Sequence, residues 1–526
     1  MIRFFFLFAF FFFSKSILSQ ENAIPLYPTK SVFEKYHNDM VFLNNSMDKI
    51  DLLKDKLQNN TQTDSLHLYK LLNNIQLSFQ KFTDLNARRL IGIDKNLAST
   101  VPIRGSEMTY LNKSFLVYKK FDQILNLFQN NLKKRFTKSQ VSYSTNLLLD
   151  IELSRISFFY KNYHNVISNK RLRRVLNASD LTFETKDNEL KKLAKKLLRK
   201  KNYRSIQKLA KKTTHYHSND SSLYQLVQST SYRKSRIKKN RKAIKKYFKH
   251  DYSHRVGQFF THYVSGAIGN FAGLFRFRKG YLYKNDSIFL EVQKRLKPMD
   301  IITEKTGFTL TDKMIPGYFG HIAIWLGTEK QLKEIQLWEH PTIVPFQNRI
   351  KQGYSILETD RKGTHLKTLK DFFNIDEIAI ASIIGFSELT RENKIILYEN
   401  ALAQLGKGYD FNFDVETSDK LVCSELLYQV FGAIHWPTDN YLKRNTISPD
   451  NVLSLALYKN TPISLTYYLG AKDRKDIYIK TLDDLAKDLG YTRKNNEYLI
   501  KGEKCTFNEI GKKKKCHKVY YPLEYQ

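Results

Sequence analysis

The sequence predicts a mainly α-helical N-terminal region followed by an α+β region, because its hydrophobic pattern changes part-way along the chain. Before about residue 250, apolar residues recur every three or four positions, which is the period of an amphipathic helix. After about residue 285, the apolar runs become short and rich in β-branched residues, and turn signals such as Pro316-Gly317 and Gly363 divide them. The 526 residues, 42% of them hydrophobic, suffice for about three domains with packed cores and exclude a wholly disordered chain.

Residues 1–19 are predicted to be a secretory signal peptide. Arg3 supplies a positive charge, an unbroken apolar run extends from Phe4 to Phe13, and Ser19 is a small residue at which a signal peptidase can cut. This run is too short to cross a bilayer, which needs about 20 apolar residues. An uncleaved anchor is the alternative. We therefore expect an exported protein, periplasmic or secreted, of a bacterial cell envelope.

Residues 24–250 are predicted to form a helical, strongly basic domain. In its first helix the spacing of apolar residues alternates between three and four, as at the a and d positions of a coiled coil. These residues are Phe33, Tyr36, Met40, Leu43, Met47, Ile50 and Leu57. The same period predicts further helices over Leu68–Phe82, Asn112–Phe136, Ser144–Tyr163 and Thr185–Lys212.

The formal net charge of +36 favours anionic partners. Lysine and arginine are densest in Lys191–Lys212 and Arg233–Lys249, and leucines interleave with the first cluster. Such a helix can lie on an anionic surface, and the alternative is a solvated face packed by its leucines. We expect the partner to be an anionic envelope polymer or a peptide substrate, with an anionic membrane surface as a further candidate. The predicted export argues against nucleic acid.

A connecting segment over 251–290 leads to the α+β domain, 291–470, and a C-terminal extension covers 471–526. Strands are predicted over Asp300–Glu304, His321–Leu326, Ile335–Trp338, Ser355–Glu358 and Ile378–Ile383. Helices are predicted over Leu366–Phe373, Glu388–Leu405 and Cys423–Ala433.

The chain has three cysteines, and their spacing divides them into a pair and a single residue. Cys505 and Cys516 bracket a short polar segment with Gly511 at a turn position, so in an oxidising compartment they can close a small loop. Cys423 is then left alone. A lone thiol in an exported protein is either a buried apolar side chain or a reactive group, and its position alone does not decide between them.

Three segments carry candidate catalytic residues. His321 opens the predicted strand His-Ile-Ala-Ile-Trp, which would hold its ring rigidly. Cys423 opens an apolar helical run after the polar stretch Thr417–Lys420, so the positive end of the helix dipole would favour its thiolate form. Glu358 ends a predicted strand, where a carboxylate can hydrogen-bond an imidazole and select its tautomer. Taken singly, each has an ordinary structural explanation.

Together these segments resemble the YiiX/YebB-like cysteine hydrolases of the NlpC-type superfamily, which have a permuted papain-like fold. The resemblance covers about residues 296–457, and the most specific signal is Cys-Ser-Glu-Leu after Tyr-Asp. The permutation accounts for the order, with His321 ahead of Cys423. Met299 and Thr359 depart from the family pattern, which has Gly and Ala there, so the turn before the first strand is in doubt. The matching segments are Leu296–Ile301, Gly320–Gly327, Ser355–Glu358, Tyr409-Asp410, Cys423–Leu426 and Ile447–Asp450.

This resemblance implies acyl transfer through a thioester, with Cys423 as nucleophile, His321 as base and Glu358 as the orienting group. Tyr409 and Ser424 are the implied substrate-binding residues, and neither a metal nor an organic cofactor is needed. The implied substrate is an amide bond in cell-wall peptides, or alternatively an acyl bond in lipids.

Two alternatives stay open at this point. Glu339, in an insertion over 334–351, is a second candidate for the orienting carboxylate; the spacing to Gly363 and Leu366 favours Glu358. The other alternative is a non-catalytic, basic envelope-binding protein that retains only the fold of a hydrolase.

Overall fold

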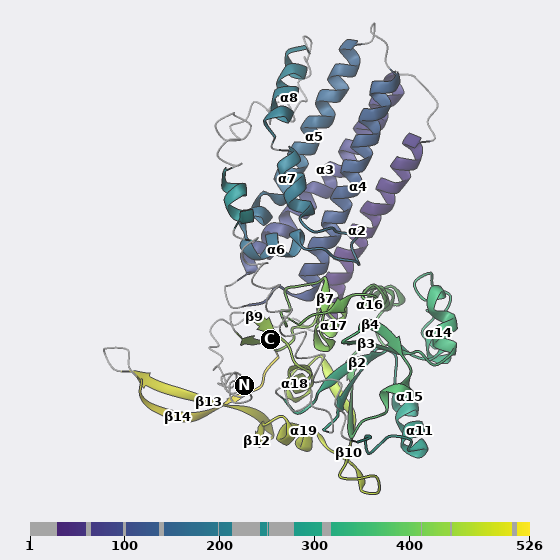
Figure 1. Ribbon diagram of the computed structural model, residues 1–526, viewed down its shortest axis with the longest axis vertical. Helices are drawn as coiled ribbons and strands as arrows, with labels where there is room; N and C mark the ends of the chain where they lie inside the picture. Colours follow the sequence, from purple (N-terminus) through teal and green to yellow (C-terminus); the bar gives the residue numbers. More distant parts are fainter. Residues whose placement is uncertain are drawn as a thin grey trace, which may run out of the picture. The chain divides into compact units, whose positions relative to one another are not determined.

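The computed structural model divides by its contacts into two compact units, Lys35–Tyr263 with Glu416–Asp419, and Val264–Val415 with Lys420–Gln526 and the N-terminal residues (Figure 1). It describes residues 29–58, 65–97, 101–135, 141–197, 199–212, 242–249, 251, 278–307, 317–411, 413–441, 444–507 and 513–525. The predicted signal peptide lies outside these residues. Within them, no helix combines the length and the apolar character that a membrane span requires.

The first unit is built from four long helices that run alongside one another (Figure 1). They are α2 (Thr29–Gln58), α3 (Ser65–Asn96), α4 (Gly105–Arg135) and α5 (Val141–Ser168), and the short helices α6 (Lys170–Asn177), α7 (Glu189–Leu197) and α8 (Lys200–Lys212) follow. The apolar positions of α2 that recur every three or four residues are buried, Met40 and Leu43 among them. The predicted helical N-terminal region is therefore confirmed.

The core of the helical unit is aromatic and also contains buried basic groups, of which Arg155 is one. The rings of Phe79 and Phe121 stack with centroids 3.5 Å apart, and Phe158 meets Phe79 edge-on at 4.7 Å. Arg155 is buried and lies 3.0 Å from a carboxylate oxygen of Asp122. Pairing of this kind is what makes a buried charge tolerable, because an unpaired one loses its hydration without compensation.

The basic helices α7 and α8 are amphipathic. Leu190, Ala194 and Leu197 on α7 and Ile206 on α8 are buried, whereas the lysines of these helices are exposed or half-buried where their side chains are described. These helices therefore have a leucine-packed side and a solvated basic side. Most of the second basic cluster, Arg233–Lys249, lies outside the described residues.

The second unit contains a seven-stranded sheet in the order β11-β10-β5-β1-β2-β3-β4, with every neighbouring pair antiparallel. Its strands are β1 (Asp300–Lys305), β2 (His321–Trp325), β3 (Ile356–Asp360), β4 (Gly363–Lys367), β5 (Glu377–Ile383), β10 (Ile463–Ala471) and β11 (Ile477–Ile479). The predicted α+β class is confirmed, and the strand that begins with His321 lies next to the central strand β1.

Helices cover the sheet and close its core. The helix α11 (Asp286–Arg295) packs Val292 into a cluster with Ala323 and Trp325 on β2, and α15 (Leu369–Phe372) adds Phe372 to it. The helix α17 (Cys423–Val430) packs against β2 and β3. The remaining elements of this part are α13 (Glu329–Glu334), α14 (Gln347–Lys351), α16 (Arg391–Leu402), α18 (Pro449–Ser454), and the two-stranded pairs β6 (Gly408–Tyr409) with β7 (Lys420–Leu421) and β8 (Asp439–Tyr441) with β9 (Arg444–Thr446).

Two local predictions in this domain are wrong. Ile335–Trp338, predicted as a strand, forms turns after α13, whose N-cap Thr328 is completed by Gln331 in a capping box. Leu366–Phe373, predicted as one helix, is divided between the end of β4 and α15. In both cases short apolar runs carry no clear period, so pairing with neighbouring strands or local capping decides the structure.

The C-terminal residues belong to this unit and are not a separate appendage. The predicted boundary at residue 470 falls within the sheet, because β11 pairs with β10 beyond it. A three-stranded sheet of β12 (Thr492–Lys494), β13 (Glu497–Phe507) and β14 (Lys513–Pro522) follows. The chain then returns to the domain, where the N–H of Lys459 donates to the carbonyl of Leu523 at 2.9 Å.

Cys505 and Cys516 lie directly opposite each other in the β13–β14 ladder. Residues opposite in an antiparallel pair have Cα atoms about 4.5–5.5 Å apart, within the range that a disulfide spans. We expect a Cys505–Cys516 disulfide in protein from an oxidising compartment. Peptide mapping by mass spectrometry with and without reductant checks this; a bridge that includes Cys423 would contradict it.

Candidate active site

Cys423 is the first residue of α17, whose N-cap is Val422. The backbone N–H of Val422 donates to the Glu425 carboxyl at 2.9 Å, so a side chain of the first helical turn caps the N-cap residue. Cys423 is 8% exposed and unbonded to another cysteine. At this position its own backbone N–H has no partner within the helix and points toward the helix entrance. The thiol and a backbone N–H that makes no bond within the helix therefore belong to the same residue.

His321 is held between the thiol and a carboxylate. Its Nε2 lies 2.9 Å from Oε2 of Glu358, and its ring also hydrogen-bonds the side chain of Cys423. Because Nε2 is occupied by Glu358, Nδ1 is the nitrogen left for the thiol. Burial lowers the pKa of His321, but the hydrogen bonds to Cys423 and Glu358 and their charges outweigh it and raise the pKa well above the ordinary value.

Glu358 comes from β3 and is fully buried. It lies opposite Ala323 on β2, so the pleat turns its side chain to the same face of the sheet as His321, two residues before Ala323. Burial alone would raise the pKa of Glu358, but contacts with His321 and His365 and the charge of Lys367 hold it well below the ordinary range. The group is therefore a carboxylate at neutral pH and can stabilise an imidazolium.

The two implied substrate-binding residues are placed differently. Tyr409 lies beside Cys423: burial, followed by the negative charge of the thiolate, raises its pKa well above the ordinary value. Pairing of β6 with β7 brings it there, with Tyr409 opposite Leu421. Ser424 is buried, and its hydroxyl donates to the carbonyl of Ile447 at 2.6 Å. In this structure the Ser424 hydroxyl links α17 to the segment at Ile447, and it is too buried to contact a substrate.

The structure also separates the two candidate orienting carboxylates. Glu339 is exposed, whereas Glu358 is in contact with His321. Met299, which departs from the family's glycine, has a φ of 65°, in the region that glycine favours. The turn is therefore made with methionine, and burial of its side chain compensates for the backbone conformation.

Gly363 explains why glycine follows Glu358 at this spacing. Its φ is 96°, and a Cβ on it would lie 2.3 Å from the carbonyl oxygen of Lys407. The next residue, Thr364, donates its N–H to that same carbonyl at 2.8 Å. The turn between β3 and β4 can therefore approach the segment that leads to Tyr409 only without a side chain at this position.

Asp450 positions the approach to His321, a role that sequence reasoning missed. Its two carboxylate oxygens accept the backbone N–H groups of Tyr318, at 2.6 Å, and Phe319, at 2.9 Å. Asp450 lies in α18, just after Ile447, which accepts the hydroxyl of Ser424. The segment 447–450 therefore connects the nucleophile helix to the start of the His321 strand.

We expect Asp450→Ala to lower kcat/KM by about 10–100-fold, because a shift of about 1 Å in a catalytic group has an effect of this size. Asp450→Asn, which keeps one acceptor, should lose less. Kinetics together with thermal unfolding measure the effect, and Asp48→Ala, at an exposed helical position, is the control. Equal activity in Asp450→Ala and the control would rule out this role.

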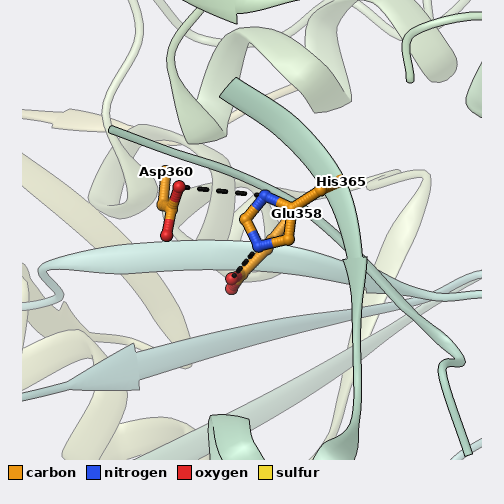
Figure 2. A group of neighbouring side chains, drawn as sticks. All are labelled: Glu358, Asp360 and His365. Atoms are coloured by element: carbon orange, nitrogen blue, oxygen red, sulfur yellow. Dashed lines mark ion pairs between the residues drawn. The ribbon is translucent and has the colours of Figure 1, made fainter. Parts of the chain in front are cut away.

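Among the described residues, Glu358, Asp360 and His365 form a group of potential metal ligands (Figure 2). However, the carboxylates face opposite nitrogens of the His365 ring: Glu358 lies 3.2 Å from Nε2, and Asp360 lies 3.8 Å from Nδ1. One ion cannot use both nitrogens of one ring, and Lys367 already lies 2.9 Å from Glu358. The group is therefore an ion-pair network. Sequence reasoning missed it, because only the pairing of β3 with β4 brings His365 opposite Glu358.

Comparison with protein families identifies the domain that carries this site. Residues 295–479 match the model of the permuted papain-like amidase enzymes, the YaeF/YiiX or C92 family. Residues 295–479 form a domain of this family. The predicted resemblance is confirmed, and the domain is a cysteine hydrolase of the amidase or peptidase type. No curated protein and no solved structure gave a significant match.

Within this C92 domain, the order of the site residues agrees with a permuted papain-like fold, since the imidazole strand precedes the nucleophile helix. The geometry can perform acyl transfer: a thiol bonded to an imidazole, a carboxylate behind the imidazole, and a free N–H donor at the helix start.

Proposed function

We propose that Cys423, His321 and Glu358 are the catalytic triad of an exported cysteine hydrolase that cleaves amide bonds in cell-wall peptides. The observation that carries the proposal is the continuous contact from the Cys423 thiol through His321 to the buried Glu358 carboxylate. A carboxylate behind the imidazole selects the tautomer and stabilises the imidazolium, which in turn stabilises the thiolate.

In the proposed reaction, His321 accepts the thiol proton and the Cys423 sulfur attacks the carbonyl carbon. The backbone N–H of Cys423 donates to the oxyanion that forms. The imidazolium gives its proton to the leaving amine, and a thioester remains. Water then attacks the thioester while His321 takes its proton, which releases the carboxylic acid and restores the thiol. The proton that leaves with the amine is replaced by one from water, so the thiol and the imidazole both end in their starting forms.

The cell-wall substrate is supported by the superfamily resemblance, by the predicted signal peptide and by the net charge of +36, which favours anionic envelope polymers. The solvated basic side of α7 and α8 is a surface on which such a polymer, or an anionic membrane, can be held. The proposed export, to the periplasm or beyond, would bring the enzyme to this substrate.

A second candidate, hydrolysis or transfer of a lipid acyl group, is favoured by the aromatic residues near the nucleophile. Tyr409 meets the ring of Phe411 at 4.7 Å and that of Phe413 at 6.5 Å. Phe413 is 41% exposed. An exposed aromatic surface of this kind suits an apolar chain, because its burial is favourable at about 25 cal/mol per Å².

Incubation of the full chain with peptidoglycan fragments and, separately, with phospholipid vesicles distinguishes the two candidates. Mass spectrometry should detect a new amine and carboxylic acid from the peptide substrate, and no product with Cys423→Ala. Release of fatty acid from the vesicles alone would assign the lipid activity instead.

A further inference from the structure

Two basic residues of β4 surround the triad carboxylate on the side away from His321. His365 lies directly opposite Glu358 in the β3–β4 ladder, and Lys367 is two residues further along on the same face. Lys367 Nζ lies 2.9 Å and His365 Nε2 3.2 Å from Oε1 of Glu358, whereas His321 lies 2.9 Å from Oε2. One oxygen therefore bonds the catalytic imidazole, and the other is paired by charge with two basic groups, neither of which makes a hydrogen bond of good geometry to it.

The contacts of His365 favour its imidazolium form. Its Nδ1 lies 2.9 Å from the carbonyl oxygen of Gly363, and its Nε2 faces Glu358, so both nitrogens meet acceptors. Figure 2 shows Asp360 and Glu358 against opposite sides of the ring. A neutral imidazole has one N–H and could satisfy only one of these acceptors. In agreement, the contact with Glu358 raises the pKa of His365.

The ammonium group of Lys367 stays protonated although aromatic and buried groups surround part of it. Burial lowers its pKa, but the charges of Glu358 and Glu304 outweigh this effect and raise it. Its ammonium lies 5.7 Å from the ring centre of Phe372, which also lies 6.0 Å from the His321 ring. Phe372 therefore lies near both Lys367 and His321, and the pairing of Lys367 with the buried Glu358 is stronger than it would be in water.

We propose that His365 and Lys367 are positioning residues of the catalytic site, which hold Glu358 as a carboxylate with Oε2 turned toward His321. The proposal rests on the triad proposed above. Burial alone favours the neutral acid at Glu358, and a neutral acid cannot stabilise the imidazolium of His321. The other titratable groups on the strands packed against β4 are Asp360 on β3, Tyr409 on β6 and Lys420 on β7.

The rate at which iodoacetamide alkylates Cys423 tests the proposal without a substrate. In the wild-type full chain we expect fast alkylation at about pH 6, because the proposed triad pairs the Cys423 sulfur with an imidazolium. Lys367→Met and His365→Gln should each lower that rate by about tenfold, the usual effect of losing a partner that orients a catalytic group. Lys367→Arg should restore it, and Lys370→Met, at an exposed lysine nearby, is the control.

The outcomes separate this proposal from the one it rests on. Slow alkylation of the wild-type protein would refute the triad itself. Fast wild-type alkylation with unchanged rates in folded Lys367→Met and His365→Gln would overturn the positioning role. Faster alkylation in the variants would also overturn it, since the cations would then weaken the contact between Glu358 and His321. Circular dichroism establishes folding, and because His365 is 33% exposed, His365→Gln serves if Lys367→Met does not fold.

Discussion

Cys423→Ala is expected to abolish turnover on every substrate of the enzyme, because no other described group in contact with His321 can carry an acyl intermediate. Removal of a nucleophile from a triad costs about 10⁶-fold in kcat in a well-studied hydrolase, which leaves only residual activity. Cys423→Ser should be nearly as damaging, since a hydroxyl is much harder to deprotonate than a thiol. Single-turnover kinetics with mass spectrometry of the acyl-enzyme measure both effects.

The fold of these variants should be unchanged, because sulfur and oxygen differ little in size and alanine leaves only a small void beside the helix start. Thermal unfolding monitored by circular dichroism is the control. Full activity of folded Cys423→Ala on any substrate of the wild-type protein would refute the proposed mechanism.

His321→Ala is expected to lower kcat/KM by about 10⁴-fold or more, since it removes both the base and the cation that stabilises the thiolate. Alkylation of Cys423 at about pH 6 should slow in parallel, because the thiolate loses its partner. If His321→Ala slowed turnover but left the alkylation rate unchanged, the imidazole would act as a base without forming an ion pair.

In the same series, Glu358→Gln should reduce activity less than either change, since an amide can still orient the ring. It should also reduce the free energy of unfolding by about 1–3 kcal/mol, because His365 and Lys367 lose their counter-charge. The partial exposure of both side chains, 33% and 29%, limits this cost. Glu339→Gln, at an exposed carboxylate, is the matched control and should change neither quantity.

The stability effect of Glu358→Gln should depend on pH in a defined direction. The pKa of Glu358 is lowered in the folded protein, so its contribution to stability is present above the ordinary value of 4.5 and is lost as pH falls toward the folded value. The difference in unfolding free energy between wild type and Glu358→Gln should therefore be largest above about pH 4.5 and shrink in more acid solution.

Several features of this protein follow from local sequence. The three-and-four spacing from Phe33 onward predicts the first long helix, because one face of such a helix must be buried. The β-branched strand led by His321 and the apolar run opened by Cys423 are likewise read from neighbouring residues. The matching segments together, above all Cys-Ser-Glu-Leu after Tyr-Asp, indicated the permuted family, and the permutation accounts for histidine preceding cysteine. Such a period or motif can be recognised without knowing which distant residues it will contact.

The tertiary structure alone decides which polar groups meet. Glu358 and Glu339 are equivalent as residue types, but only strand register brings Glu358 against His321. His365 and Lys367 have no sequence signal, since their approach to Glu358 depends on the register of the β3–β4 hairpin. Asp450 reaches Tyr318 across more than a hundred residues. Such contacts depend on pairing and packing between segments that are distant in the sequence. The periodicity of a local segment carries no information about those interactions.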